Sequence, residues 1–214
     1  MSVPEVSRRL SLVLCSALLV TGGVNAGDTI EDWKAFYPRP FDASVKNGEI
    51  VGREQVRRVF VSCGTNEFVF AVPVDLRVDV RANKVTLISP DASYFLSFRI
   101  VLPADSDSGG SITDPYRRHV MDQFPDAKIV EEASQSAAGR SGPAFEMQWK
   151  AGSGPERNVR VALIPSPAGL LEWSLNADSA KVAAGRSASS FLLRTFQSNE
   201  RGAIEIVRRV IDRS

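Results

Sequence analysis

The sequence predicts an α+β fold in which an antiparallel β-sheet is covered by helices. Three consecutive runs between Lys128 and Phe196 alternate apolar with polar side chains, as strands with one buried and one wetted face require. Their apolar members are Phe145, Met147 and Trp149, then Val159, Val161 and Leu163, then Leu171, Trp173 and Leu175. A helical period follows, with spacings of three and four among Ala184, Ala188, Phe191, Leu192, Thr195 and Phe196. The sheet face and the helix stripe are adjacent in sequence, so we expect them to pack together.

Residues 1–26 show the three-part pattern of a secretory signal peptide. Two arginines precede an apolar run, Leu10–Val20, which is too short to span a bilayer, and Val24–Ala26 offers small residues for cleavage. The general secretory route is favoured over twin-arginine export, because Ser11 stands where that signal has a bulky apolar residue. We therefore expect a periplasmic or secreted protein with no stable membrane span after cleavage.

The charge balance argues against binding to nucleic acid or to anionic lipid. The full chain has 26 Lys and Arg against 25 Asp and Glu, and loss of residues 1–26 would leave 24 of each. Both kinds of partner select a basic excess, which this mature chain lacks. Cleavage would also remove Cys15, whose bulky neighbour Leu14 disfavours lipidation, and leave Cys63 as the only cysteine. Its apolar neighbours favour burial over an intermolecular disulfide.

The mature chain divides into an N-terminal extension at 27–66, an α+β domain at 67–198 and an amphipathic tail at 199–214, for which helix is favoured over strand. In the extension we expect a short helix over Ile30–Tyr37 and a tight hairpin turn at Asn47–Gly48, two residues that tolerate positive φ.

The first strand lies at the end of the extension and pairs with the first strand of the domain, and a second hairpin follows. The predicted pairs are Val56–Val61 with Phe68–Val72, and Lys84–Ser89 with Tyr94–Leu102. Asp114 and Pro115 then open a helix to Phe124 in the favoured N-cap and N1 order, with Tyr116, Val120, Met121 and Phe124 facing inward.

A strand over Lys128–Ala133 leads into the three alternating runs, whose short, turn-rich joins predict an antiparallel meander. Asn176–Ser179 supplies N-cap residues for the closing helix. Phe191 is expected in the interface with the meander, among Phe145, Trp149, Val161 and Trp173.

Several of these runs are similar to one known fold superfamily. The carrying residues are Phe68–Pro73, the helix after Asp114, Phe145–Trp149, and Leu175–Ala177 with Phe191–Phe196. Over residues 68–196 the chain resembles the PsbP-like extrinsic photosystem proteins, the Ran-binding Mog-type transport factor and bacterial exported proteins of unknown role. The resemblance implies an α/β/α sandwich and a binding or assembly role, although a fold does not fix function.

No residue is assigned to catalysis, to a cofactor or to a metal. His119 is the only histidine, and its charged neighbours along the chain predict a solvated surface position. Nucleophilic catalysis by serine or cysteine normally needs a histidine base. Glu131 and Glu132 are adjacent, so in a strand they point to opposite faces and form no carboxylate pair.

Two functions from different classes are expected. The favoured one is an exported, non-enzymatic binding or assembly module with a protein partner in the cell envelope, because the packing pattern is complete without a chemical constellation. The alternative is a small-ligand or metal-binding envelope protein, or a hydrolase, built around Asp105, Asp107 and Asp114. The loop at these residues resembles a calcium loop, but Tyr116 stands where an EF-hand needs a glutamate, which favours a solvated loop.

Overall fold

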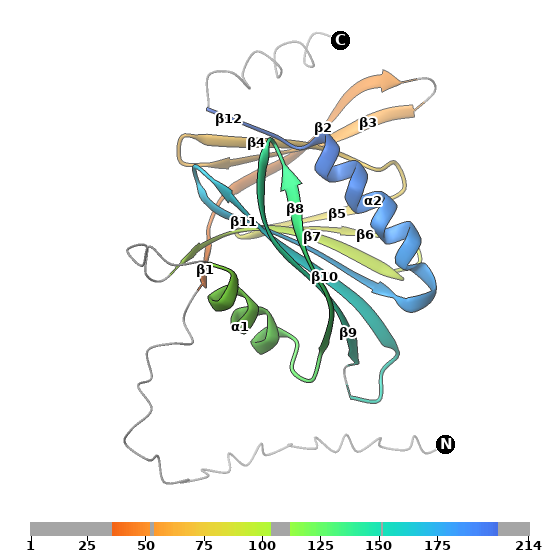
Figure 1. The fold of residues 1–214 in the computed structure, drawn as a ribbon. Helices are drawn as coiled ribbons and strands as arrows, with labels where there is room; N and C mark the ends of the chain where they lie inside the picture. Colours follow the sequence, from red (N-terminus) through yellow and green to blue (C-terminus); the bar gives the residue numbers. More distant parts are fainter. Residues whose placement is uncertain (1–35, 52–53, 104–111, 151, 201–214) are drawn as a thin grey trace, which may run out of the picture. The chain divides into compact units, whose positions relative to one another are not determined.

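The computed structural model describes residues 36–51, 54–103, 112–150 and 152–200. These residues form two antiparallel sheets, two α-helices and one short 3-10 helix (Figure 1). The strands are β1 Phe36–Arg39, β2 Asp42–Val51, β3 Glu54–Cys63, β4 Asn66–Val72, β5 Arg77–Arg81, β6 Lys84–Ile88, β7 Tyr94–Pro103, β8 Lys128–Ala137, β9 Arg140–Lys150, β10 Glu156–Ser166, β11 Gly169–Asp178 and β12 Gln197–Glu200. The helices are α1 Thr113–Gln123, the 3-10 helix η1 Ser179–Lys181 and α2 Val182–Thr195.

The large sheet has eight strands in the order β5-β6-β7-β11-β10-β9-β8, with β1 paired to the far end of β7. The small sheet has four strands in the order β12-β4-β3-β2. The predicted hairpins are confirmed as β3–β4 and β6–β7, and the predicted meander as β9, β10 and β11. The strand β5 was not expected from the sequence.

The main core lies between the two sheets and α2. Phe98 of β7 is at its centre, with ring centroids 5.8 Å from Phe70, 4.8 Å from Trp173 and 6.1 Å from Phe196. These three partners come from the small sheet, from the large sheet and from the end of α2. Long-range packing of aromatic rings therefore joins all three parts.

A second core lies between α1 and the opposite face of the large sheet. Tyr116 and Val120 of α1 are buried against a group of strand residues. That group includes Phe36, Val101, Phe145, Met147, Val159, Val161 and Leu163. Val161 is paired with Ser174 and not with Trp173, so the apolar faces of β10 and β11 point to opposite sides of the sheet.

The predicted position of Phe191 is therefore wrong. Phe145 and Val161 pack in the second core with α1, with Trp149 beside them, and only Trp173 lies on the side of α2. Phe191 itself is only half-buried, whereas Leu192, one residue later, is 1% exposed in the main core.

Local details differ from the sequence prediction at several turns and caps. Asn47 and Gly48 do not form a hairpin turn, because β2 continues through them with a bulge between Asn47 and Ile50. The predicted helix at 30–37 lies mostly outside the described residues, and its last two residues belong to β1. Helix α1 begins at Thr113, with Ile112 as its N-cap. The predicted signal at residues 1–26 and most of the predicted tail, residues 201–214, lie outside the described residues.

Candidate functional site

Helix α2 runs beside the small sheet and contacts β4, β7 and β11 (Figure 1). The buried residues of α2 are Gly185, Ala188 and Leu192, which recur at helical spacing. A Cβ at position 185 would lie 2.7 Å from Leu175 Cδ1, so the glycine permits the close approach of helix and sheet. The two flanks of the helix are left for other contacts.

An apolar groove of about 530 Å³ lies along one flank of α2. Its walls come from β3, from the end of β4 with the residues after it, from the start of β7 and from the helix. The lining residues are Val56, Val72, Pro73, Val74, Tyr94, Ala184, Ser187, Ala188 and Phe191. Small-molecule sites typically have volumes of about 300–1,000 Å³ and are mostly apolar with few polar groups. The groove has this character.

Two side chains give the groove a polar component without charge. Ser187 contributes a hydroxyl from α2, and Tyr94 contributes a phenol from β7. Burial raises the pKa of Tyr94, and the carboxylates of Asp91 and Asp75 raise it further. The phenol is therefore a neutral hydrogen-bond donor at physiological pH.

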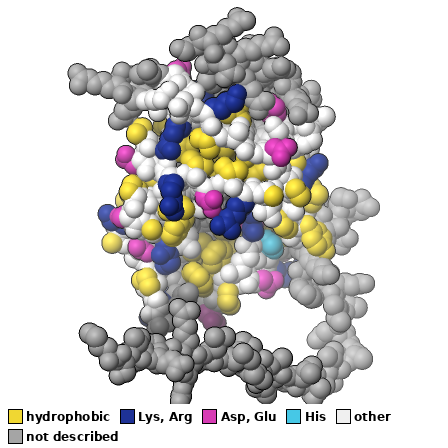
Figure 2. Space-filling view, turned by 180° about the vertical axis from the view of Figure 1, so that it is seen from behind, with side chains coloured by type: hydrophobic (Ala, Val, Ile, Leu, Met, Phe, Trp, Pro, Cys, Tyr) yellow, Lys and Arg dark blue, Asp and Glu magenta, His cyan; other side chains and the backbone are white. Residues whose placement is uncertain are grey.

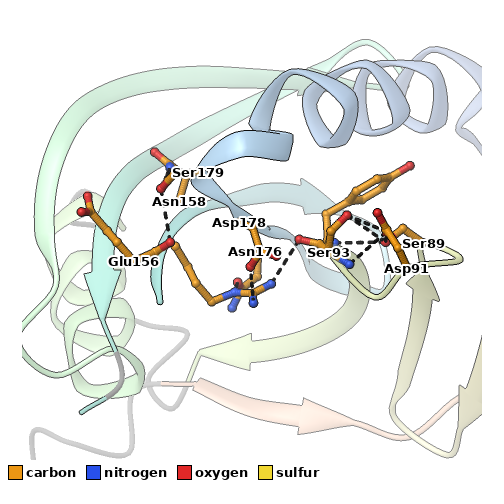
Figure 3. Close-up of polar contacts among 10 residues, drawn as sticks. Ser89, Asp91, Ser93, Glu156, Asn158, Asn176, Asp178 and Ser179 are labelled. Carbon is orange, nitrogen blue, oxygen red and sulfur yellow. Dashed lines mark hydrogen bonds and ion pairs between the residues drawn. The ribbon is translucent and has the colours of Figure 1, made fainter. Parts of the chain in front are cut away.

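Polar contacts fix the turn that carries Tyr94 (Figure 3). The Asp91 carboxylate accepts hydrogen bonds from Ser93 Oγ at 2.6 Å and from Ser89 Oγ at 2.9 Å, and these bonds hold the pKa of Asp91 well below its usual range. Lys181, the residue before α2, has its Nζ 3.5 Å from the same carboxylate. The turn thus links the start of β7 to the start of α2, at one end of the groove.

Arg157 of β10 joins the same turn to β11 through Ser93 and Asn176, which are labelled in Figure 3. Its Nη1 lies 2.7 Å from Asp178 Oδ1, its Nε donates to Asn176 Oδ1, and its Nη2 donates to the Ser93 carbonyl oxygen at 3.4 Å. The guanidinium also lies 5.4 Å from the ring centroid of Phe95. Because partners within the protein engage this guanidinium on several sides, we interpret the network as support for the turn and not as a ligand site.

A second polar cluster connects α1 to the large sheet. Glu172 of β11 is 4% exposed, and its Oε1 accepts a hydrogen bond from Arg99 Nε at 2.5 Å. Its Oε2 lies 3.6 Å from His119 Nε2. Gln123 completes the cluster: its Oε1 accepts from Arg99 Nη2 at 2.7 Å, and its Nε2 lies 2.6 Å from His119 Nε2.

The Glu172 carboxylate is closed to a substrate. Burial raises the pKa of Glu172, but the neighbouring His119 imidazole and the charged, hydrogen-bonded Arg99 outweigh burial, and the net pKa is lowered. The carboxylate is ionised and almost fully covered, so its charge is used to hold α1 on the sheet. Figure 2 shows basic and acidic side chains scattered among hydrophobic ones over one face of the molecule, with no single-sign patch.

The prediction of a solvated His119 is wrong. The ring centroid of Phe36 lies 4.8 Å from that of His119, and the ring of Tyr116 is stacked on it at 6.1 Å. Phe36 and Glu172 lie on strands distant in sequence, so the charged neighbours along the helix gave no sign of this environment. Glu172 falls at a polar position of the run Leu171, Trp173 and Leu175, so the alternation gave no sign of its burial either.

The acidic alternative remains a prediction. Asp105 and Asp107 lie outside the described residues, and Asp114 is exposed in the first turn of α1. Among the residues that the structure describes, no group of three or more His, Cys, Asp or Glu side chains could hold a metal ion. Cys63 is 2% exposed, so its predicted burial is confirmed.

No family model and no curated protein match the chain. Two solved structures are similar to it. Cyanobacterial PsbP (CyanoP) from Synechocystis sp. PCC 6803 is 16% identical with a TM-score of 0.44, over 71% of this chain and 98% of that chain. LpqN of Mycobacterium tuberculosis, described as involved in cell envelope biogenesis, is 12% identical with a TM-score of 0.43, over 71% and 98%. The comparison finds the PsbP-like resemblance that the sequence indicates, and no conclusion about function rests on it.

Within the described ranges, no helix has both the length and the apolar character needed to cross a membrane.

Proposed function

We propose that this chain is an exported, non-enzymatic binding module that takes a small apolar molecule into the groove beside α2. The observation that carries the proposal is the groove itself, about 530 Å³ in volume and lined only by uncharged side chains. Burial of apolar surface contributes about 25 cal/mol per Å², so such a lining favours a hydrocarbon or aromatic group. Ser187 and the Tyr94 phenol can orient one polar end of that molecule.

Two further features support a binding role. The contacts of His119 with Glu172, Gln123 and two aromatic rings join α1 to the strands of the large sheet, which is a structural use of the histidine. The signal pattern at residues 1–26 supports export of the module from the cytoplasm. A protein partner in the envelope, the favoured expectation from the sequence, would use the same groove for an apolar side chain.

The test is a titration of the mature chain with N-phenyl-1-naphthylamine, a dye whose fluorescence rises in an apolar site. Ala184→Trp fills the groove from its exposed rim, whereas Ala183→Trp puts the same ring on the neighbouring exposed position, outside the lining. We expect at least tenfold weaker dye binding in Ala184→Trp and no change in Ala183→Trp. Equal binding by the two variants would remove the groove as the site.

Pull-down from envelope extract with the same two variants identifies the kind of occupant. A protein lost only with Ala184→Trp would show that the groove takes an apolar side chain of a partner. If dye and apolar small molecules compete and no protein is lost, the occupant is a small molecule.

A further inference from the structure

A polar cavity of about 180 Å³ lies on the flank of α2 opposite the apolar groove. Its polar lining comes from Gln135 on β8, Arg160 on β10, and Arg186, Ser189 and Ser190 on α2, and two leucines complete it. The spacing of 186, 189 and 190 places these three side chains on one side of the helix, away from Ala184, Ala188 and Phe191. The cavity and the groove are thus separate sites.

Glu146 of β9 holds the two arginines beside the cavity. Its side chain is only 7% exposed, and it lies directly opposite Arg160 in the pairing of β9 with β10. Arg160 Nη1 is 3.3 Å from Glu146 Oε2, and Arg186 Nη2 donates to Glu146 Oε1. Each carboxylate oxygen thus binds a different guanidinium, and the trio keeps one net positive charge. A guanidinium has five N–H donors, so both arginines keep donors for a ligand.

Two hydroxyls in the cavity and one buried indole N–H next to it lack partners within the described residues. The hydroxyls of Ser189 and Ser190 have no hydrogen-bond partner among the described residues. Trp173 is 6% exposed, and its indole N–H is buried without a partner in the described part of the chain. Trp173 lines a smaller cavity of about 10 Å³, which shares Arg160 and Ser189 with the larger one. The Trp173 indole therefore lies beside the larger cavity and can report on changes in it.

We propose that this cavity binds a phosphate group, either free or as part of a larger molecule. Donors outnumber free acceptors, and two guanidiniums held from different elements match the several oxygens of a tetrahedral dianion. Besides Glu146, which both arginines already bind, Glu131 is an exposed carboxylate that lies opposite Glu146 in the pairing of β8 with β9 and would repel an anion. Its removal should strengthen phosphate binding.

The experiment follows the indole N–H resonances of the ¹⁵N-labelled mature chain as sodium phosphate replaces sodium chloride at constant ionic strength. We expect a saturable downfield shift of the Trp173 resonance, assigned with Trp33→Phe and Trp149→Phe. The Trp149 resonance is the internal control, because its Nε1 already donates to the Pro125 carbonyl oxygen at 3.1 Å. A purely structural role of the arginines predicts no phosphate-dependent shift at Trp173.

Matched variants decide whether the arginines bind the anion. Arg186→Gln should weaken phosphate binding at least tenfold, while Arg194→Gln, an exposed arginine on the same helix outside the cavity, should leave it unchanged. Glu131→Gln should tighten it. An unchanged Trp149 resonance in each variant shows that the fold is retained. No saturable shift, or the same affinity in Arg186→Gln as in the parent, would overturn the proposal.

Sedimentation with phosphatidylglycerol vesicles separates the two sources of phosphate. Cosedimentation that free phosphate and Arg186→Gln both abolish assigns a lipid headgroup to the cavity. Phosphate binding without cosedimentation assigns a soluble phosphate compound. The apolar dye titration is a separate measurement, so failure of either site leaves the other standing.

Discussion

Replacing Phe196 by alanine tests which side of α2 faces the sheets. Phe196 is 4% exposed at the end of α2, and its ring centroid lies 5.4 Å from that of Trp173 and 5.8 Å from that of Phe68. Trp173 and Phe68 are held by strand pairing in two different sheets. The surroundings therefore relax only partly when the ring is removed, and a cavity remains.

The expected loss is large compared with that at Phe191. Truncating a buried phenylalanine to alanine costs about 3–5 kcal/mol. With a urea slope of about 2.5 kcal/mol/M, a loss of about 4 kcal/mol lowers the unfolding midpoint by about 1.6 M. Phe191→Ala removes the same atoms from a half-buried position beside the groove, so we expect about 1 kcal/mol, or a shift of about 0.4 M.

Urea unfolding followed by tryptophan fluorescence and far-UV circular dichroism measures both midpoints. Arg194→Ala, an exposed position on the same helix, serves as the control and should stay within about 0.5 kcal/mol of the parent. If Phe191→Ala lowers the midpoint as much as Phe196→Ala, α2 does not pack through Ala188, Leu192 and Phe196. The groove and the cavity would then both be misplaced.

Three further substitutions or probes test other parts of the packing. The pKa of Glu172 in the folded protein lies below its ordinary value of 4.5. The stabilisation from its carboxylate is therefore present above about pH 4.5 and is lost as the pH falls through the folded pKa. Glu172→Gln should lower Tm at pH 7 and flatten the fall of Tm in acid. In Gly142→Ala the new Cβ would meet the Leu163 carbonyl oxygen at 1.8 Å, so we expect a loss of at least about 2 kcal/mol in urea unfolding, whereas Gly139→Asn, at a φ of +74°, should be nearly neutral. Burial raises the pKa of the Cys63 thiol, so a thiol reagent should modify it slowly in native protein and fully in urea; immediate native reaction would contradict its burial.

Much of the strand content could be predicted because alternation is a property of each strand alone. The alternating runs that begin at Phe145, Val159 and Leu171 predict β9, β10 and β11 without any knowledge of the strands they pair with. The side of the sheet on which each run buries its apolar set depends on register, which is a property of pairs of strands. Val161 pairs with Ser174, so β10 and β11 bury their apolar side chains on opposite sides of the sheet. The closing helix was predicted to pack on β9, β10 and β11, and of these three strands it packs on β11.

The contacts of His119, and the meeting of Arg160 with Arg186, could not be predicted from the sequence for the same reason. His119 meets Glu172 and Phe36 only because β1 and β11 both pair with β7. Arg160 and Arg186 meet only through Glu146, on a third element. No short spacing in the chain encodes either contact, whereas Cys63 could be placed inside from its own strand.

The composition of α2 favours a binding role for both the apolar groove and the polar cavity. Between Val182 and Ser190 the helix consists mainly of alanine, glycine and serine. A helix selected only for stability would carry larger apolar side chains at Ala184 and Ser187, which would fill the groove and bury more surface. Small residues instead keep both flanks open while Leu192 and Phe196 anchor the last turn. Local choices that lower stability without a packing gain are expected where binding is selected, and here they coincide with the groove on one flank and the arginine cavity on the other.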